Sequence, residues 1–189
     1  MVTLQDTDIV SALQKDGERG FRLLMTKYKQ VVYWHIRRLV VSHDDAQDAA
    51  QETFIRVFRS FGQFKGKDSL EQLQEKSSLA AWIYRIATNE ALRILQRRHN
   101  EQLSLENVQT EANRLKAENF VDYNDLEAVK LQKAILSLPT KQQLAFNLRY
   151  YDELGYDEIA NITGSTPANV KANYHIAKEK IVKYMKTND

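Results

Sequence analysis

One helical segment, residues 79–98, carries side chains that can bind nucleic acid. Its apolar residues recur on one face, and a polar and aromatic set recurs on another. That second set is Trp82, Arg85, Asn89, Arg93 and Arg97. Arginine and asparagine can bind phosphates and base edges, and an aromatic ring can stack on an unpaired base. Taken alone, the segment favours another interpretation, in which the tryptophan anchors a helical bundle and the arginines extend into solvent.

A second segment typical of nucleic-acid binding is residues 156–171, which predict two helices joined by a short turn. Gly164 lies four residues after Ala160, where a positive φ reverses the chain. Thr166 is a good N-cap residue, and Pro167 suits the first helical position. This spacing is typical of a helix-turn-helix, whose second helix lies in the major groove of DNA. An ordinary helical hairpin with a capped turn is the alternative.

Composition indicates that helices position these residues. The 189-residue chain is 43% hydrophobic and has only six glycines and two prolines, which favours long helices over a β fold. No apolar run approaches the length of a membrane span, and the first residues are acidic and amphipathic rather than signal-like. The absence of cysteine excludes disulfides and thiolate metal sites. We therefore expect an all-α, cytoplasmic protein.

Little in the chain supports an enzyme. Its four histidines are scattered, and it has neither a cysteine nor a glycine-rich loop that could hold phosphates. Acid pairs such as Asp44/Asp45 lie at predicted helix starts, where capping explains them. We expect no catalytic residues, no cofactor and no metal.

The chain divides into three parts. Residues 1–100 predict a helical bundle, and residues 126–189 predict a smaller helical domain that holds the helix-turn-helix. Between them, residues 101–125 carry six acidic and two basic side chains and lack strong apolar periodicity. We interpret this acidic stretch as a linker. The alternative is a surface helix of one continuous domain.

Within the first part, residues 44–61 predict an amphipathic helix with acids in its first turn. The inward stripe consists of Ala46, Ala50, Phe54, Val57 and Phe61. The opposite face carries Asp48, Gln51, Glu52, Ile55 and Arg59. A charged face is usually only solvated, but an isoleucine within such a face is unusual.

Several of these segments together resemble the conserved regions of bacterial sigma factors. The second region is matched by Asp45–Phe54, by Phe64-Lys-Gly and by Trp82–Asn89. The fourth region is matched by Leu138-Pro and then by residues 156–171. Because no third-region domain lies between them, the chain resembles the small extracytoplasmic-function type. The resemblance covers most of residues 5–100 and 126–186 and leaves the linker unmatched.

The resemblance implies a protein that bridges core RNA polymerase and promoter DNA. The first domain is expected to dock on the β′ clamp helices, and the second to reach the β flap. The matched docking positions are Asp48, Gln51, Glu52 and Ile55. An apolar Ile55 suits this role, because interfaces surround hydrophobic contacts with a polar rim. An anti-sigma factor that covers the DNA-binding surfaces is also implied.

The resemblance further implies that residues 79–98 engage the downstream (minus-10) promoter element and help to melt it. Stacking and phosphate contacts can offset the free energy of unstacking a flipped base. The candidates are Trp82, Tyr84, Arg85, Asn89, Arg93 and Arg97. Tyr84 fits the core equally well. The chain departs from the family pattern by extra residues at 67–76, where relatives form the loop that captures the flipped base.

The helix that starts at Thr166 is expected to read the upstream (minus-35) element. The first side chains of a recognition helix reach base edges, and later ones reach the backbone. We therefore expect base contacts from Thr166, Asn169 and Asn173, and phosphate contacts from Lys171, His175 and Lys178. Five lysines and one glutamate lie between residues 165 and 186, so binding should be salt-sensitive. Relatives often carry arginines at the positions of Asn173 and Ile176.

Two other functional classes fit parts of the pattern. A helix-turn-helix regulator that binds DNA alone would leave the outer face of residues 44–61 without a role. The other is a helical adaptor that binds only proteins. Association with core RNA polymerase distinguishes these alternatives from a sigma factor.

Overall fold

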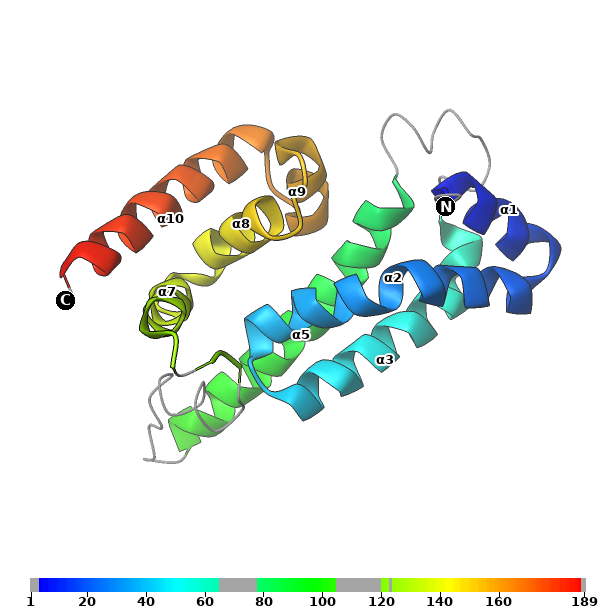
Figure 1. Ribbon diagram of the computed structural model, residues 1–189. Coiled ribbons are helices and arrows are strands. Elements are labelled where there is room, and N and C mark those ends of the chain that lie inside the picture. The colour runs from blue at the N-terminus through cyan, green and yellow to red at the C-terminus, as the bar shows by residue number, and fades with distance from the viewer. Residues whose placement is uncertain (1–3, 65–77, 105–119, 123, 188–189) are drawn as a thin grey trace.

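The computed structural model describes residues 4–64, 78–104, 120–122 and 124–187, and these are mostly helical. The N-terminal helices are α1 (Asp6–Lys15), α2 (Gly17–Val40), α3 (His43–Ser60), the 3-10 turn η1 (Phe61–Gln63) and α5 (Leu79–Ser104). The C-terminal helices are α7 (Leu126–Leu136), α8 (Thr140–Tyr150), α9 (Tyr156–Thr163) and α10 (Pro167–Thr187). The described ranges contain no strand, and the predicted all-α fold of two helical domains is confirmed (Figure 1). None of the described helices combines the length and apolarity needed to cross a lipid bilayer.

The first domain is a bundle of α1, α2, α3 and α5 around one apolar core. Asp16 begins α2, because its side chain accepts the backbone N–H groups of Glu18 and Arg19, each at 3.1 Å. The inward stripe predicted on α3 is buried, apart from a half-buried Phe61. The core includes Leu24, Val32, Ile36, Ala46, Phe54, Ile83 and Ala87. The periodicity of the sequence therefore located this core correctly.

The second domain has two apolar clusters. The helices α7, α8 and α10 enclose the first, which consists of Ala134, Ile135, Leu138, Phe146, Ala177 and Ile181. Asp125 caps α7, because its Oδ1 accepts the backbone N–H of Ala128 at 2.9 Å. The second cluster includes Ile159 of α9 and Val170 of α10. It holds the two helices of the helix-turn-helix at their crossing.

The two domains lie directly against each other. Leu144 of α8 belongs to the core cluster of the first domain, and Tyr84 of α5 belongs to the cluster around Ile159. Figure 1 shows α8 and α9 beside α2 and α5, with α10 on the outside of the second domain. The charge pattern, an acidic stretch between basic helices, raises the hypothesis that the domains close on each other through the basic helices, but the periodicity of each half does not indicate which residues meet.

The predicted linker begins inside a helix, since α5 continues to Ser104, past the expected boundary at residue 100. Residues 105–119 of that linker and the extra residues at 67–76 lie outside the described part of the chain. Just before α7, the ring of Phe120 lies 5.3 Å from the guanidinium carbon of Arg37. That contact places the end of the linker beside α2. The exact domain boundaries stay a prediction.

Candidate nucleic-acid interface

The turn between α9 and α10 depends on the backbone of one glycine. Gly164 adopts φ 64° and ψ 36°, in the left-handed region. The N–H groups of Gly164 and Ser165 both donate to the carbonyl of Ala160, which closes the end of α9. A β-carbon on Gly164 would meet nothing within 4 Å, so space does not require glycine here. Glycine is required here by the left-handed backbone conformation, which residues with a β-carbon rarely adopt.

The start of α10 is capped as predicted. The Oγ1 of Thr166 accepts the backbone N–H of Asn169 at 3.2 Å, and Pro167 is the first residue of the helix. At the start of α9, Glu158 Oε2 accepts the backbone N–H of Gly155 at 2.9 Å. Both helices of the motif are therefore fixed at their N-termini by their own side chains.

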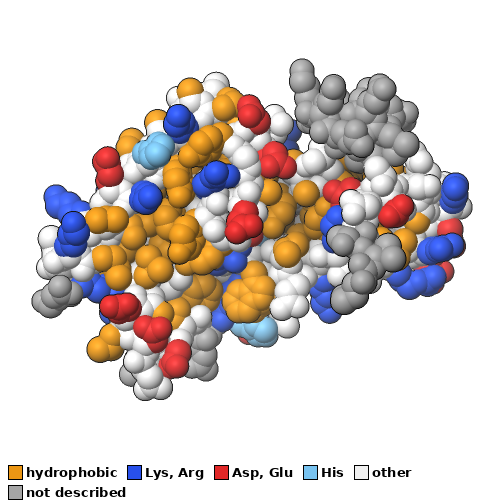
Figure 2. Space-filling view, turned by 45° about the horizontal axis from the view of Figure 1, so that its top comes forward, with side chains coloured by type: hydrophobic (Ala, Val, Ile, Leu, Met, Phe, Trp, Pro, Cys, Tyr) orange, Lys and Arg blue, Asp and Glu red, His pale blue; other side chains and the backbone are white. Residues whose placement is uncertain are grey.

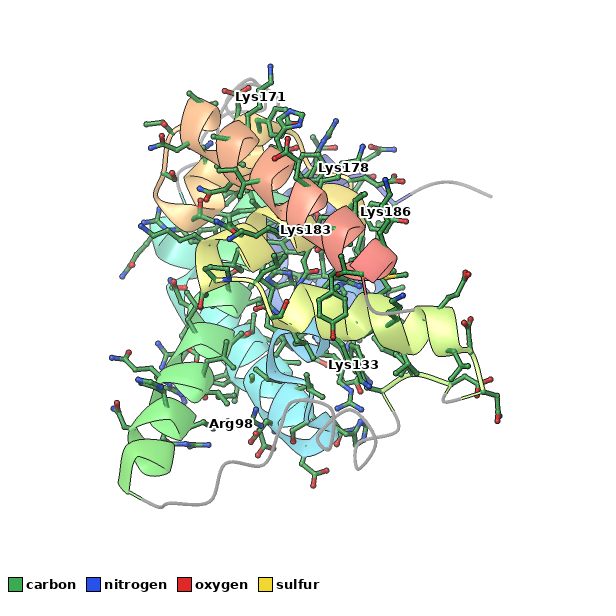
Figure 3. The ribbon with its side chains drawn as sticks, turned by 90° about the vertical axis from the view of Figure 1, so that its left-hand side faces the viewer. Arg98, Lys133, Lys171, Lys178, Lys183 and Lys186 are labelled. Atoms are coloured by element: carbon green, nitrogen blue, oxygen red, sulfur yellow. The ribbon has the colours of Figure 1, made fainter. Side chains whose placement is uncertain are left out.

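The residues predicted to bind the upstream element are mostly exposed on α10. Those on the surface are Thr166, Asn169, Lys171, His175 and Lys178. Asn173 differs, because it is half-buried and its Nδ2 donates to the carbonyl of Asn169 at 3.0 Å. Figure 3 shows Lys171, Lys178 and Lys186 spaced along α10. One helix thus brings together all the exposed members of this set.

Further along α10, the basic residues surround a shallow groove of about 460 Å³. It is lined by His175, Lys178, Glu179, Val182, Lys183, Lys186 and Thr187. Lys180 points elsewhere, since its Nζ donates to Oε1 of Gln142 on α8 at 2.9 Å. Figure 2 shows basic side chains dispersed among hydrophobic ones over the left half of the molecule, where the second domain lies. The basic side chains do not form a broad patch on this face.

On α5 the predicted downstream-binding set is divided between the surface and the interior. Arg85, Asn89, Arg93 and Arg97 are exposed. Trp82 is half-buried, and its ring centroid lies 4.9 Å from that of the buried Phe64. Tyr84 is only 5% exposed and lies at the contact between the domains. The sequence was compatible with either a core or a DNA-binding position for Tyr84, and in the structure its side chain is in the core.

The hydroxyl of Tyr84 donates to Asp152 Oδ1 at 3.2 Å. Burial, followed by the nearby Asp152 carboxylate, raises the pKa of the Tyr84 phenol above its ordinary value. The phenol therefore remains a neutral hydrogen-bond donor at physiological pH. In this arrangement it contacts the second domain and is not exposed to solvent.

Glu90 of α5 is a buried carboxylate that the sequence interpretation missed. Its Oε1 lies 2.9 Å from Nε of Arg56 on α3, and its Oε2 lies 2.9 Å from Nη2 of Arg93. The side chain is only 5% exposed. A usable signal existed, because residue 90 is spaced three and four residues from Ala87 and Ile94 on the apolar face. A carboxylate on such a face implies a buried partner.

The far end of α5 is held to the first domain by arginines. Arg98 donates to the carbonyl of Val40 at 2.6 Å and also pairs with Asp45. The Nη2 of Arg97 lies 3.9 Å from Oδ1 of the same aspartate. Arg97 and Arg98, at the C-terminal end of α5, therefore help to hold α5 against α2 and α3. Arg85 and Asn89, one turn apart near the middle of the helix, remain exposed.

The predicted polymerase-docking residues border a groove between α2 and α3. Asp48, Gln51 and Ile55 line it, together with Phe21, Met25, Thr26, Lys29, Gln30, Tyr33, His43, Gln47, Ala50 and Phe54. Its volume is about 960 Å³. Glu52 is not in the lining and instead pairs with Nε of Arg56 at 2.9 Å. The sequence interpretation missed the α2 wall, because it assigned docking to a single helix face.

Comparisons with known proteins agree with this arrangement. Residues 24–101 match the family model described as Sigma-70 region 2, and residues 128–181 match Sigma-70, region 4. The chain is 29% identical over 188 residues to the RNA polymerase sigma-H factor of Pseudomonas aeruginosa, covering 95% of this chain and 93% of that protein. It is also 29% identical over 192 residues to the ECF RNA polymerase sigma-E factor of Escherichia coli K12, covering 94% and 93%.

Two solved structures share the fold. The sigma factor RpoE of Bartonella quintana, solved with the anti-sigma factor NepR, superposes with a TM-score of 0.67 at 19% identity, covering 89% of this chain and 98% of that one. CnrH, solved with the cytosolic domain of CnrY, superposes with a TM-score of 0.71 at 16% identity, covering 97% and 99%. With both sigma-70 regions matched in order and full-length relatives of this class, the chain belongs to the extracytoplasmic-function sigma factors, which direct RNA polymerase to promoters.

Proposed function

We propose that this sigma factor holds core RNA polymerase on the groove between α2 and α3 and reads promoter DNA with α10 and α5. In this proposal the β′ clamp helices occupy the groove, and the second domain contacts the β flap. The protein acts by binding in the bacterial cytoplasm, without catalysis or a cofactor. One observation carries the proposal: a single chain holds a region 2 bundle with an open groove and a capped region 4 helix-turn-helix.

The groove suits a helical partner because it combines apolar and polar walls. Ile55 contributes apolar surface on α3, and Phe21 and Met25 contribute it on α2. Asp48 and Gln51 supply polar groups at the same site. Such a mixture is typical of interfaces that form and separate, where a hydrophobic centre lies within a polar rim. Glu52 contributes charge near the groove while pairing with Arg56.

The start of α10 suits the upstream element. Thr166 and Asn169 lie in its first turn and are exposed, as base-reading side chains at the start of a recognition helix must be. Lys171, His175 and Lys178 follow on the surface, where they can bind phosphates. Asn173 lies at the edge of the cleft between the domains and needs that cleft to open before it can reach a base.

For the downstream element, α5 supplies Arg85 and Asn89 on its exposed face. Trp82 rests on Phe64, so its ring is held by a rigid neighbour. A half-buried, supported aromatic side chain is a suitable platform for an unpaired base, because little side-chain entropy is lost on stacking. Arg93, Arg97 and Tyr84 complete the proposed set, and Tyr84 must first leave its contact with Asp152. This surface is the part of the molecule that we propose takes part in melting.

An anti-sigma factor is a further proposed partner. One structural neighbour, RpoE of Bartonella quintana, was solved with the anti-sigma factor NepR, and the present fold superposes on it. We expect the inhibitor to cover the surfaces of α5 and α10. It would thereby compete with DNA.

The experiment is transcription in vitro from a library of random promoter fragments by core polymerase, with and without the purified chain. We expect a defined set of start sites that depends on the chain. Ile55→Ala should weaken binding to core polymerase at least several-fold while leaving the melting temperature unchanged, and Arg59→Ala on the same helix is the matched control. If no start site in the library depends on the chain, the promoter-directing function is contradicted. If Ile55→Ala binds core polymerase as tightly as the unchanged chain, the groove between α2 and α3 is not the polymerase site.

A further inference from the structure

A buried carboxylate joins the two domains. Asp152 lies in the turn after α8, and its side chain is only 5% exposed. Its Oδ1 accepts from Nη2 of Arg38 at 2.5 Å and from the hydroxyl of Tyr84 at 3.2 Å. Its Oδ2 lies 3.4 Å from Nδ1 of His35, which is fully buried. We call Asp152, Arg38, Tyr84 and His35 the latch.

The latch is positioned from both sides. In the second domain, the N–H groups of Tyr151 and Leu154 donate to carbonyls of α8 at 3.0 Å, which fixes the turn that carries Asp152. In the first domain, His35 Nε2 lies within hydrogen-bond distance of Thr88 Oγ1, at 2.8 Å. The guanidinium of Arg38 also lies 4.8 Å from the ring centroid of Tyr151. One acidic side chain of the second domain thus meets donors from both α2 and α5.

Some buried polar atoms in and near the latch have no hydrogen-bond partner within the described residues, and Nδ1 of His35, Nε of Arg38 and Oδ2 of Asp152 are among them. Asn147 of α8 is fully buried, and neither its Nδ2 nor its Oδ1 has a hydrogen-bond partner within the described residues. The Nε2 of the buried Gln143 is in the same state. A buried amide without a hydrogen-bond partner destabilises the arrangement that buries it. The latch and the apolar contacts of Leu144 and Tyr84 therefore hold the domains together, while the unpaired polar groups oppose this arrangement.

The closed arrangement covers part of one proposed DNA surface. Tyr84 is buried in the latch, as described above. Asn89 of α5 and Asn173 of α10 line the same cleft between the domains, of about 350 Å³. A cleft of that volume has the size of a small-ligand pocket, so a nucleic acid strand does not fit between the domains at this place. The α2–α3 groove and the first turn of α10 lie outside the contact.

We propose that the latch holds this sigma factor in a closed resting state, in which the polymerase groove is accessible and the downstream-reading face of α5 is partly covered. Breaking the latch separates the domains and exposes Tyr84 and Asn173 beside Asn89, which is already on the surface. This inference rests on the proposed function only where it assigns DNA contacts to α5. The closed state itself is inferred from contacts between the domains, those of Asp152 and the apolar ones of Leu144 and Tyr84, and not from any role in DNA binding.

A distance measurement tests the closed state without DNA. The chain has no cysteine, so Arg59→Cys on α3 and Asn161→Cys on α9 allow one spin-label pair in the full-length protein. We expect one narrow distance distribution for the otherwise unchanged chain. Asp152→Asn should add a longer and broader population, and Arg38→Gln should do the same from the other domain. The control is Asp157→Asn, which removes the same charge from an exposed position of α9.

A change of opposite sign sharpens the test. Asn147→Leu replaces the unpaired amide by an apolar side chain of similar volume and should reduce any long-distance population. Identical distributions for the unchanged chain, Asp152→Asn and Arg38→Gln would overturn the latch, provided that their melting temperatures show folded domains. Asp152→Asn could fail to fold. In that case the latch is overturned if neither Arg38→Gln nor Asn147→Leu changes the long-distance population.

A binding measurement then tests the covered surface. The probe is a labelled forked duplex whose downstream element is single-stranded, with its sequence taken from a start site selected with the unchanged chain and core polymerase. Without polymerase, Asp152→Asn should bind this probe about tenfold more tightly, because a larger fraction of the protein is open. Asp157→Asn should bind like the unchanged chain. Longer distances with unaltered affinity would overturn the covering of α5 while leaving the promoter-directing function intact.

Discussion

The two proposed DNA-reading helices, α10 and α5, carry similar side chains in different surroundings. On α10, five of the six predicted residues are exposed, and the helix is capped by its own Thr166. On α5, Trp82 rests on Phe64, Tyr84 contacts Asp152, and Arg93 pairs with Glu90. The difference teaches that residue type and helical spacing suffice to predict which side chains are exposed only when one helix carries the whole set. Where several helices contribute, the same side chains can be held in structural contacts.

The largest expected effect tests whether the exposed set on α10 depends on a few buried residues. Ile159→Ala removes a fully buried side chain at the crossing of α9 and α10. We expect a loss of about 2–5 kcal/mol in the free energy of unfolding of the second domain, measured by urea denaturation. Binding to the upstream element should fall with it. A loss below about 1 kcal/mol would mean that the crossing is not the support of this surface.

The next effect isolates the backbone of the turn. Gly164→Ala places a β-carbon on a residue at φ 64°, and we expect a loss of about 1–2 kcal/mol. Gly62→Ala is a matched control, because its β-carbon would also meet nothing within 4 Å and its φ is not positive. Thermal unfolding of both variants measures the difference. Equal stabilities would remove the left-handed conformation as the reason for glycine.

A smaller effect concerns α5. Glu90→Ala leaves Arg56 and Arg93 without their shared carboxylate. Because both arginine side chains are about half or more exposed, water replaces much of the lost interaction, and we expect a loss of about 1 kcal/mol in unfolding free energy. Urea denaturation of the first domain checks this value. A loss as large as that expected for Ile159→Ala would show that Glu90 is a central support of the bundle.

The smallest effect compares one cation from each helix. Lys171→Ala should lower the slope of log affinity against log salt by about one, equally for all promoter variants. Arg93→Ala should lower it less, because Glu90 already compensates part of that charge. Fluorescence anisotropy across a salt series measures both slopes. Equal changes in slope would mean that Glu90 does not restrain Arg93 in the bound state.

Much of the fold could be predicted from the sequence, because local rules determine it. The stripe at Ala46, Ala50, Phe54 and Val57 is buried as its spacing indicated, and Gly164 and Thr166 have the predicted turn and cap roles. The roles of Glu90 and Asp152 could not be predicted in the same way, because their partners are distant in the chain. Arg56 lies 34 residues before Glu90, and Arg38 lies 114 residues before Asp152. The α2 wall of the groove was missed for the same reason.

Helix α5 also has a mechanical consequence. Its 26 residues contain neither proline nor glycine, and such a helix forms a nearly straight rod about 39 Å long. Its far end is clamped by the bonds of Arg98 to Asp45 and to the carbonyl of Val40, which are independent of the second domain. Departure of the second domain therefore leaves the rod in place. In the proposed open state, the side chains of α5 are therefore already aligned before a DNA strand binds.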